Sequence, residues 1–564
     1  MIYLGLHNSF QAGACLFVDG ELIGAVTEER FNRIKNYHGF PHLSIDYLLD
    51  EANITLNEVN KVVYGMVDSV TPDKKSLEKI MNIVAEGSSQ SPSLKNKYIE
   101  RVTSEASWND RHLNELYDWA NENELPEDLI LIDHHESHAA GAYYTSPFDD
   151  ALVFTCDGKG NYKSSAVYDA NGDDLTLLDF HTTFDSIGYF YGNITKALGY
   201  KPESHEGKVT GLAAYGDANN FKHITDRILS FDEESGKINV RMGRYHLPWF
   251  TDKLDTPLFY SSVAKFKKED VAAAAQEAVE DVLSKWVEYS IKKYKGRKTN
   301  ICLSGGVFAN VKLNQVLREL DLVDNVFIQP AMGDMGIPLG SCLVAMKNDG
   351  ECYNKFEESM ALGPEFSNEE IEKYLEDNDI NYLWSACVEK DVATMIEHGK
   401  VIGFLSGRME YGPSALCNRS ILYHCRDAKI NDWLNERLNR TEFMPFAPVT
   451  TVELADQCFV DWKPEHACAE FMTMVYNVTD KFKDNCPAAV HVDGTARPQI
   501  VTKTNNPIMH EILTEHHKLT GDLALINTSF NNHEEPIVCD IKDAINSLNR
   551  NNVDVLVMGD FIVS

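Results

Sequence analysis

Two similar sets of short apolar runs stand out in the pattern of hydrophobic and polar positions. The first set covers residues 2–6, 14–18 and 22–27, and the second covers residues 151–156, 165–168 and 175–180. A turn-forming pair separates the last two runs of each set, Asp19-Gly20 in the first and Asn171-Gly172 in the second. Short apolar runs with such pairs between them predict strands joined by tight hairpins. The repetition predicts two related halves within a mixed α/β fold.

A long amphipathic helix is predicted between residues 269 and 293. Its apolar positions recur at helical spacing on one side, at Val271, Ala275, Val279, Leu283 and Val287. Residues 70–125, by contrast, are polar and helix-like. We interpret that region as an insertion or cap with no visible chemistry.

A double glycine follows the strand predicted at residues 300–303. The sequence there is Ser304-Gly305-Gly306, and a helix is predicted after Asn310. A strand, two glycines and a helix can cradle a nucleotide, because backbone amides and a helix N-terminus meet phosphate there. A purely structural turn is the alternative. Residues 206–216 are rich in small side chains, which permit close packing or the approach of a ligand.

The composition changes between residues 348 and 370, where the chain is polar and rich in turn-forming residues. This change predicts a boundary between a first domain, residues 1–352, and a second domain, residues 362–564. The second domain holds three arginine-bearing segments with hydroxyl or amide side chains, at residues 407–420, 439–448 and 491–497, and a fourth segment of hydroxyl and amide side chains, at residues 527–531. Bidentate positive charge with neutral donors is what a small phosphorylated anion requires.

Charge narrows the range of partners. The chain has 564 residues, of which 43% are hydrophobic, and its formal net charge is −34. Nucleic acid and anionic membranes are polyanions, so we expect no binding to either. No run approaches the roughly 18–20 apolar residues that span a bilayer, and the first residues lack a basic start, so we expect a cytoplasmic protein. The twelve cysteines show no paired C-x-x-C spacing, which argues against a disulfide framework or a zinc–thiolate site.

A pair of histidines supplies the first candidate for chemistry. His134 and His138 are four residues apart, where a short apolar run gives way to an alanine-rich segment. On a helix, both rings would project from one face and could share a cation. Asp334 lies between glycines after the strand predicted at residues 326–329, which suits a ligand role, although a solvated loop is the alternative.

Several of these segments occur together in the order seen in a known family. They are the histidine pair and residues 28–35, 206–216, 304–310, 407–420, 445–448 and 527–538. In this combination the chain resembles the O-carbamoyltransferases of nodulation-factor and antibiotic-tailoring pathways. The resemblance implies an N-terminal actin-like domain, similar to the metalloprotein that transfers threonylcarbamoyl to tRNA, and a C-terminal YrdC-like domain. It also implies that carbamoyl phosphate and ATP, used with Mg²⁺, form carbamoyl adenylate, and that a hydroxyl of a small-molecule acceptor receives the carbamoyl group.

The resemblance also assigns roles to individual residues. The implied metal ligands are His134, His138, Asp157 and Asp334. Iron(II) is expected by resemblance, whereas the ligand types alone would equally accept zinc or manganese. The implied nucleotide- and phosphate-holding residues are Glu206, Lys208, Gly305, Gly306, Asn310, Ser420, Thr528 and Ser529. The implied residues for activating carbamoyl phosphate are Arg419, Arg440 and Arg497.

The chain departs from the family pattern in both domains. Ser414 and Cys417 stand where an arginine and a glycine are usual, and Leu438 and Met444 replace two further cations. Near the N-terminus, Phe10-Gln11 replaces a common His-Asp pair. His7 and Lys35 are therefore the two candidates for the base on the acceptor side.

Three functions remain open at this point. The first is an O-carbamoyltransferase. The second is a phosphotransferase of the actin-like superfamily, which would explain the repeated hairpins but not the second domain. The third is a catalytically impaired nucleotide-binding or regulatory protein, in which the lost cations have emptied the C-terminal site. The sequence identifies neither the acceptor nor the oligomeric state.

Overall fold

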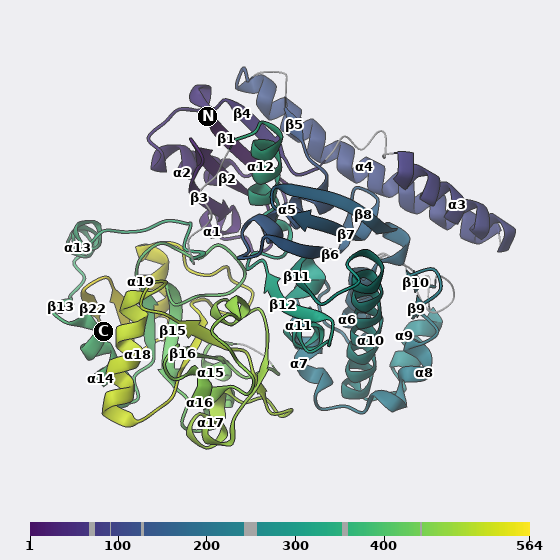
Figure 1. The fold of residues 1–564 in the computed structure, drawn as a ribbon. Helices are drawn as coiled ribbons and strands as arrows, with labels where there is room; N and C mark the ends of the chain where they lie inside the picture. The colour runs from purple at the N-terminus through teal and green to yellow at the C-terminus, as the bar shows by residue number, and fades with distance from the viewer. Residues whose placement is uncertain (67–73, 91, 126–128, 242–256, 352–358, 440–442) are drawn as a thin grey trace. The chain divides into compact units, whose positions relative to one another are not determined.

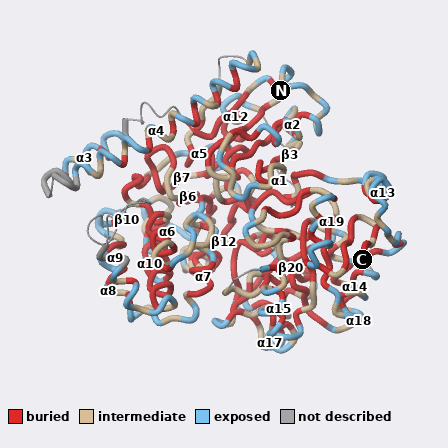
Figure 2. Tube along the Cα trace, turned by 180° about the vertical axis from the view of Figure 1, so that it is seen from behind, coloured by how far each residue is buried: buried red, intermediate tan, exposed pale blue. Residues whose placement is uncertain are grey.

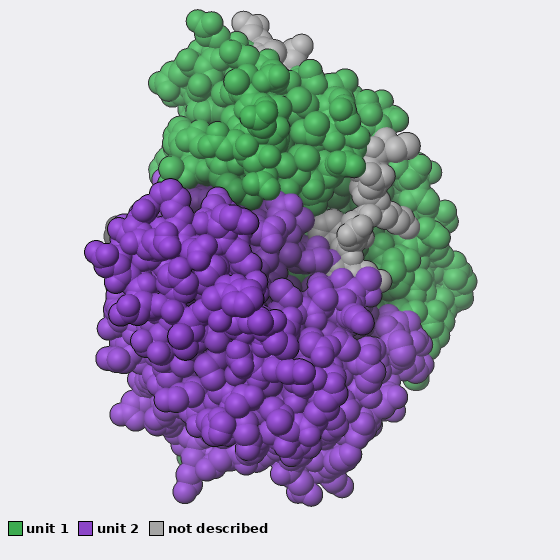
Figure 3. Space-filling model, turned by 90° about the vertical axis from the view of Figure 1, so that its left-hand side faces the viewer, with its two compact units in different colours: residues 1–23, 38–355 green, residues 24–37, 356–564 purple. Residues whose placement is uncertain are grey.

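The computed structural model describes residues 1–66, 74–90, 92–125, 129–241, 257–351, 359–439 and 443–564 (Figure 1). Its strands form several sheets, including mixed ones, and helices pack on them. This architecture confirms the predicted α/β class. Contacts divide the chain into two units, one of residues 1–23 and 38–355 and the other of residues 24–37 and 356–564 (Figure 3). A short N-terminal segment therefore belongs to the unit built from the C-terminal part of the chain.

The first sheet has the strand order β3-β2-β1-β4-β5. Its strands are β1 (Ile2–His7), β2 (Gly13–Val18), β3 (Glu21–Thr27), β4 (Lys61–Tyr64) and β5 (Ile130–Leu131). β1 pairs antiparallel with β2 and parallel with β4. The predicted turn between β2 and β3 is confirmed, since Asp19 and Gly20 both have positive φ, as a two-residue hairpin of this type requires.

The second sheet repeats this arrangement, with the order β8-β7-β6-β11-β12. Its strands are β6 (Asp150–Gly160), β7 (Lys163–Asn171), β8 (Asp174–Thr182), β11 (Thr299–Ser304) and β12 (Val323–Ile328). β6 pairs antiparallel with β7 and parallel with β11, as β1 does with β2 and β4. The shared strand order confirms the predicted duplication.

Two buried helices connect the sheets of this unit. α12 (Ile337–Asn348) packs on β1, β2 and β4, whereas α5 (His134–Tyr144) packs on β6 and β11. The two helices also pack against each other, closely enough that a Cβ added at Gly340 would lie 1.8 Å from the carbonyl oxygen of Ser137. Only glycine allows this approach, so α5 is held tightly between the halves.

The remaining helices of the first unit cover its sides. The predicted long helix is confirmed as α10 (Lys268–Tyr294), which packs on α6 (Ile187–Ala197), α7 (Glu206–Ala213) and α11 (Val311–Arg318). The polar region forms α3 (Lys74–Gln90) and α4 (Pro92–Glu122), which pack on each other. Figure 2 shows buried residues inside the unit and exposed residues along α3.

The second unit is built on an eight-stranded mixed sheet with the order β13-β22-β21-β14-β15-β20-β16-β19. Its strands are β13 (Leu383–Trp384), β14 (Ile402–Leu405), β15 (Arg419–His424), β16 (Ala447–Thr451), β19 (Gln499–Val501), β20 (Leu525–Ser529), β21 (Val555–Met558) and β22 (Phe561–Val563). α14 (Val388–Glu397) and α18 (Pro507–Thr520) pack together over its core.

The N-terminal segment of this unit contains α1 (Glu29–Asn32) and is fastened by arginines. Arg33 donates hydrogen bonds to the carbonyl oxygens of Pro536 and Ile537, at 2.8 and 2.7 Å. Arg30 donates to the carbonyl oxygen of Gly412 at 2.9 Å. Residues 28–35, which match the family pattern, thus pack within the second unit.

Candidate metal centre

α5 begins where the sequence supplies a capping carboxylate. Asp133 is the N-cap residue, and its side chain accepts hydrogen bonds from the backbone N–H groups of His135 and Glu136, at 3.0 and 3.1 Å. An N-cap of this kind satisfies donors that have no partner within the helix. His134 and His138 therefore occupy the first turn and the next on one face, and their ring centroids are 4.8 Å apart.

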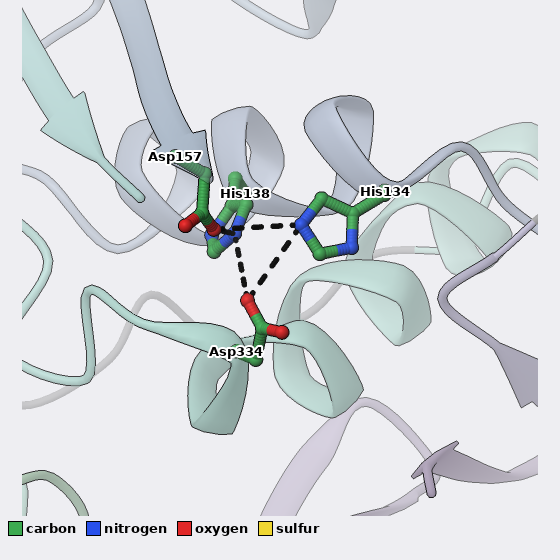
Figure 4. Close-up of side chains that lie close together, drawn as sticks. All are labelled: His134, His138, Asp157 and Asp334. Atoms are coloured by element: carbon green, nitrogen blue, oxygen red, sulfur yellow. Dashed lines mark hydrogen bonds and ion pairs between the residues drawn. The ribbon is translucent and has the colours of Figure 1, made fainter. Parts of the chain in front are cut away.

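Two aspartates, one on the second sheet and one from the segment after it, meet this histidine pair (Figure 4). Asp157 comes from β6, and Asp334 follows β12. Asp157 Oδ2 lies 3.2 Å from His138 Nε2 and 3.6 Å from His134 Nε2. Asp334 Oδ1 lies 3.6 Å from each of the same nitrogens. One ligand atom from each residue thus falls within 4.8 Å of the others, and we call these four residues the quartet.

The quartet is a buried set of opposite charges. Burial lowers the pKa of His138, but the hydrogen bonds and charges of Asp157 and Asp334 outweigh that effect and raise it to about 9. Burial raises the pKa of Asp334, but the neighbouring imidazoles outweigh it and hold that pKa well below its ordinary value. The pocket therefore favours a positive charge between the two carboxylates.

The two histidine rings differ in their hydrogen bonding. His138 Nδ1 lies 3.1 Å from Ser304 Oγ, which fixes the ring so that Nε2 faces the aspartates. Both ring nitrogens of His134 are buried and have no hydrogen-bond partner among the described residues. Buried polar atoms are rarely left without a partner, so the His134 ring is suited to coordinate a bound metal ion.

Glycines make the room in which these side chains lie. A Cβ at Gly160 would lie 2.1 Å from Cδ2 of His134, and one at Gly188 would lie 2.8 Å from the carbonyl oxygen of Asp157. Gly305 has a φ of 103°, and a Cβ there would lie 2.3 Å from the carbonyl oxygen of Cys156. No local pattern marks Gly160 or Gly188, because the need for glycine at these positions arises from neighbours distant in sequence.

One of the two candidates for the acceptor-side base lies beside the quartet. His7, at the end of β1, is buried, and its Nε2 is 3.6 Å from Asp334 Oδ2. Lys35 is exposed and belongs to the other unit. The structure therefore brings His7, and not Lys35, together with the quartet inside one unit.

The predicted nucleotide segments of the first unit are joined by buried hydrogen bonds. Asn310 caps α11 and exchanges two hydrogen bonds with the side-chain amide of Gln276, at 2.8 and 3.1 Å. Tyr191 Oη donates to Gln276 Oε1 and also lies 3.0 Å from Thr210 Oγ1 of α7. The network links the helix after Gly305-Gly306 to the helix that carries Glu206.

Glu206 and Lys208 lie at the start of α7. Partial burial raises the pKa of Glu206 to about 7, and the Lys208 side chain is buried. Lys208 is thus held inside the unit, whereas Glu206 is half-buried. Their predicted role toward a nucleotide stays a prediction.

Arg419 is buried in the second unit and hydrogen-bonded to its backbone, which the sequence did not indicate. Its guanidinium is fully buried and donates to backbone carbonyl oxygens from four parts of the unit. The acceptors are Pro364 at 2.8 Å, Gly407 and Asn418 at 3.0 Å, and Cys539 at 3.3 Å. These bonds give Arg419 a structural role, and its predicted role in activating carbamoyl phosphate stays untested.

The other predicted residues of the second unit are placed by two strands. β15 and β20 pair so that Ser420 lies opposite Ser529, and Thr528 is the next residue along β20. Arg497 is half-buried between β18 (Thr495–Ala496) and β19. Arg440 lies outside the described residues. Three of the predicted hydroxyl residues are thus neighbours on one sheet.

Glu410 organises the loop before β15. Its Oε1 accepts hydrogen bonds from the backbone N–H groups of Leu416, Asn418 and Arg419, at 2.7, 2.7 and 3.0 Å. Cys417, which replaces the usual glycine, has a φ of 77°. That conformation favours glycine, which explains why the family pattern has glycine there. Glu410 was not among the predicted residues. Its position as an acidic residue in a segment with glycines and arginines was the signal that could have identified it.

Two family models match the chain. The model described as "Carbamoyltransferase N-terminus" matches residues 3–343, and the one described as "Carbamoyltransferase C-terminus" matches residues 393–564. Together they span most of both units. All four quartet residues lie within the N-terminal match, and Arg419, Ser420, Arg497, Thr528 and Ser529 lie within the C-terminal one.

Curated relatives resemble the chain over nearly its whole length. The Synechocystis protein sll1178 is 32% identical, over 99% of this chain and 95% of its own length. Nodulation protein NolNO of Sinorhizobium fredii is 30% identical, over 99% of this chain and 80% of its own length. Nodulation protein U of Rhizobium tropici is 27% identical, over 94% of this chain and 90% of its own length.

Solved structures resemble it only weakly. Component A of the (R)-2-hydroxyglutaryl-CoA dehydratase of Acidaminococcus fermentans is 15% identical, with a TM-score of 0.34, over 62% of this chain and 99% of its own. This likeness is too low to carry an argument. Among the described residues, no helix is both long enough and apolar enough to cross a membrane.

Proposed function

Because the chain belongs to the carbamoyltransferase family, we propose that it is an ATP-dependent O-carbamoyltransferase acting on a small molecule. In the first reaction, carbamoyl phosphate, water and ATP give carbamoyl adenylate, phosphate and pyrophosphate. In the second, a hydroxyl oxygen of the acceptor bonds to the carbamoyl carbon, the bond from that carbon to the AMP oxygen breaks, and the hydroxyl proton is released. The products are the O-carbamoylated acceptor and AMP.

The observation that carries this proposal is the convergence of the quartet. Two imidazole nitrogens and two carboxylate oxygens from three distant segments meet at a buried point, and the His134 ring has no other hydrogen-bond partner among the described residues. Such a mixed nitrogen and oxygen set fits a divalent transition metal, and by resemblance we propose iron(II). A bound cation of this kind would polarise a carbonyl oxygen and stabilise the charge that develops on it.

Neighbouring residues hold the two histidines of the quartet in position. Ser304 fixes the ring of His138, and Asp133 and Gly160 fix the position of His134 by capping and by leaving space. Ligands held by outer partners lose little entropy on binding and keep their geometry. His7 lies where it can accept the proton of an acceptor hydroxyl, since it is buried beside Asp334 and has no hydrogen-bond partner among the described residues.

Activation of carbamoyl phosphate is proposed for the second unit. Ser420 and Ser529 lie opposite each other on the paired strands β15 and β20, Thr528 is the next residue of β20, and Arg497 supplies a half-buried cation. Arg440 is proposed for the same task from the family resemblance. Forming a mixed anhydride and breaking a phosphoanhydride both accumulate negative charge on oxygen, which such donors stabilise. Glu206, Lys208, Gly305, Gly306 and Asn310 are proposed to hold the nucleotide in the first unit.

The proposal is tested by incubating the protein with carbamoyl phosphate, ATP and Mg²⁺. We expect release of pyrophosphate and phosphate. ADP and a phosphorylated acceptor would instead support a phosphotransferase, and binding without turnover would support a regulatory protein. In parallel, elemental analysis should find about one divalent metal ion per chain, and none after anaerobic reconstitution would remove the proposed site.

One substitution separates the two half-reactions. Arg497→Ala is expected to abolish formation of pyrophosphate, because it removes the cation proposed to hold carbamoyl phosphate, while leaving the metal content unchanged. Loss of both properties together would indicate misfolding. Retention of full pyrophosphate release would show that Arg497 has no part in activation.

A further inference from the structure

The tight turn between β6 and β7 lies directly against the start of α5. Asn161 and Tyr162 are its two residues. Asn161 Oδ1 accepts a hydrogen bond from the backbone N–H of His134 at 2.9 Å. Lys163, the residue after the turn, donates from Nζ to Oδ2 of the N-cap residue Asp133 at 2.6 Å. The turn therefore holds the end of α5 that carries a member of the quartet.

The backbone of this turn has an unusual conformation. Its φ angles are 49° at Asn161 and 66° at Tyr162. A two-residue hairpin turn of this kind needs positive φ at both positions, which the pair Asn-Gly adopts most readily. A bulky side chain such as that of tyrosine disfavours this conformation, so it persists only where surrounding groups hold it. The turn is therefore held by contacts that lie outside its own sequence.

A buried carboxylate of α4 provides one of these contacts. Glu105 Oε1 accepts a hydrogen bond from the backbone N–H of Tyr162 at 2.8 Å, and the Glu105 side chain is 1% exposed. Its Oε2 lies 3.5 Å from Nη2 of Arg101, one helical turn earlier. Arg101 Nη2 also donates to Thr183 Oγ1 at 2.8 Å. This ion pair thus joins α4 to the turn and to the segment that follows β8.

The side chain of Tyr162 is held by the same helices. Its ring is buried in a cluster with Phe184 and with Ile80 of α3, and Tyr98 and Val102 of α4 pack against the cluster. The rings of Tyr98 and Phe184 meet edge to face, with centroids 4.8 Å apart. Buried aromatic contacts of this kind stabilise one packing arrangement. Both the N–H and the ring of Tyr162 therefore contact the α3–α4 region.

Only one residue separates this contact from a metal ligand of the quartet. Glu105 holds Tyr162, and the preceding residue, Asn161, holds the N–H of His134. Gly160, one residue earlier, leaves the space in which the His134 ring lies. A shift of the turn would therefore move both the hydrogen-bond acceptor and the neighbouring backbone of His134.

We propose that the α3–α4 region positions the metal centre, and that Glu105 and Asn161 are its positioning residues. The inference rests on the proposed function, because it concerns the centre at which carbamoyl transfer is proposed to occur. Neither residue belongs to the quartet, and both act through His134. The polar region in which the sequence shows no chemistry thereby sets the affinity and geometry of the metal site.

The first test compares two variants of Glu105 in the full chain. Glu105→Ala removes the acceptor for the Tyr162 N–H, whereas Glu105→Gln keeps an oxygen acceptor there. Co²⁺ is the probe, because it follows iron(II) in the usual order of affinities and its visible absorption depends on ligand geometry. We expect Glu105→Ala to bind Co²⁺ about 10–100-fold more weakly in competition with a chelator and to change its absorption, and Glu105→Gln to stay within about threefold of wild type.

Two controls separate positioning from general stability. Glu100→Ala removes an exposed carboxylate of the same helix, and Val287→Ala truncates a buried side chain of α10. Val287→Ala should lower the midpoint of urea unfolding, and both controls should keep the affinity and absorption of wild type for Co²⁺. Wild-type affinity in Glu105→Ala, or equal loss in Glu105→Ala and Glu105→Gln, would overturn the role assigned to this hydrogen bond.

Variants of Asn161 test the next step toward the quartet. Asn161→Gly keeps the positive φ and removes the acceptor for the His134 N–H, whereas Asn161→Asp keeps an oxygen acceptor. The glycine variant should lose about 10–100-fold in Co²⁺ affinity, and the aspartate variant should bind at least as tightly as wild type. Because both positions act through His134, Glu105→Ala/Asn161→Gly should lose no more than the weaker-binding single variant. If the two losses multiply, the proposed connection between them is wrong.

The inference and the proposed function fail in different ways. Wild type that binds no divalent metal would refute the metal centre and the inference with it. Pyrophosphate release and Co²⁺ binding by wild type, with equally tight binding by Glu105→Ala, would refute the positioning alone. Weakened Co²⁺ binding in Glu105→Ala and Asn161→Gly, with no pyrophosphate release by wild type, would support the positioning and refute the proposed reaction.

Discussion

Gly160→Ala tests whether space at the second sheet positions His134. The added methyl would lie 2.1, 2.3 and 2.8 Å from Cδ2, Cγ and Cβ of His134. Carbon atoms do not approach so closely, and the neighbour is the stem of a ring fixed at the start of a buried helix, so the ring must move. Overpacking of this kind costs about 1–3 kcal/mol of unfolding free energy.

The same displacement should weaken metal binding as well as folding. When the groups that hold a ligand in place are altered, metal affinity falls by about 10–100-fold. We therefore expect Gly160→Ala to lose metal at chelator concentrations that wild type withstands, with a fall of about 1–3 kcal/mol in unfolding free energy. Chelator titration followed by elemental analysis gives the first quantity, and urea unfolding gives the second.

Gly158→Ala is the matched control for this prediction. It lies on the same strand, but its added methyl would meet only Tyr189, at 3.8 Å, which is ordinary contact. It should keep wild-type metal affinity. If Gly160→Ala binds metal as tightly as Gly158→Ala does, the view that this glycine positions His134 is wrong.

Two further predictions concern buried charges. Because the pKa of His138 is raised to about 9 in the folded, metal-free protein, its stabilising contribution is complete below about pH 6.5 and is lost as the pH rises through 9. After removal of metal, wild type should thus lose up to about 3 kcal/mol more than His138→Gln between these pH values, as measured by urea unfolding; parallel curves would contradict this. Arg419→Met should destabilise the second unit by more than about 3 kcal/mol, because it leaves several buried carbonyl oxygens without donors. A stable Arg419→Met variant that has lost only pyrophosphate release would show that this arginine acts on the substrate instead.

The local elements of the fold could be predicted from the sequence. The hairpin turn at Asp19-Gly20 and the long helix α10 follow from patterns within a few residues to a few turns, and both are present. The duplication was also predictable, because each half repeats the same succession of runs and turns. Such patterns are local, so they can be recognised directly in the sequence.

The site was predictable only in part. The spacing of His134 and His138 indicated a shared face, since residues four apart on a helix lie one above the other. Asp157 was assigned through resemblance and not through spacing. The proximity of β6 and β12, which brings Asp157 and Asp334 to the histidines, depends on both strands pairing with β11, and no local pattern encodes that pairing.

For other residues, the chemical type of the side chain follows from the sequence, whereas its contacts follow from the tertiary structure. Arg419 could have bound phosphate, but five backbone contacts absorb its donors. Residues 24–37 follow the first two strands in sequence, yet they pack with the C-terminal unit.

The sequence by itself therefore determined the class of fold, the repeat and the types of side chain available for chemistry. Only the tertiary structure decided which of them meet: the quartet and the glycines that make room for it. The physical reason is that side-chain periodicity acts over a few residues, whereas a site requires groups far apart in the chain to converge, and that convergence is set by strand pairing and helix packing.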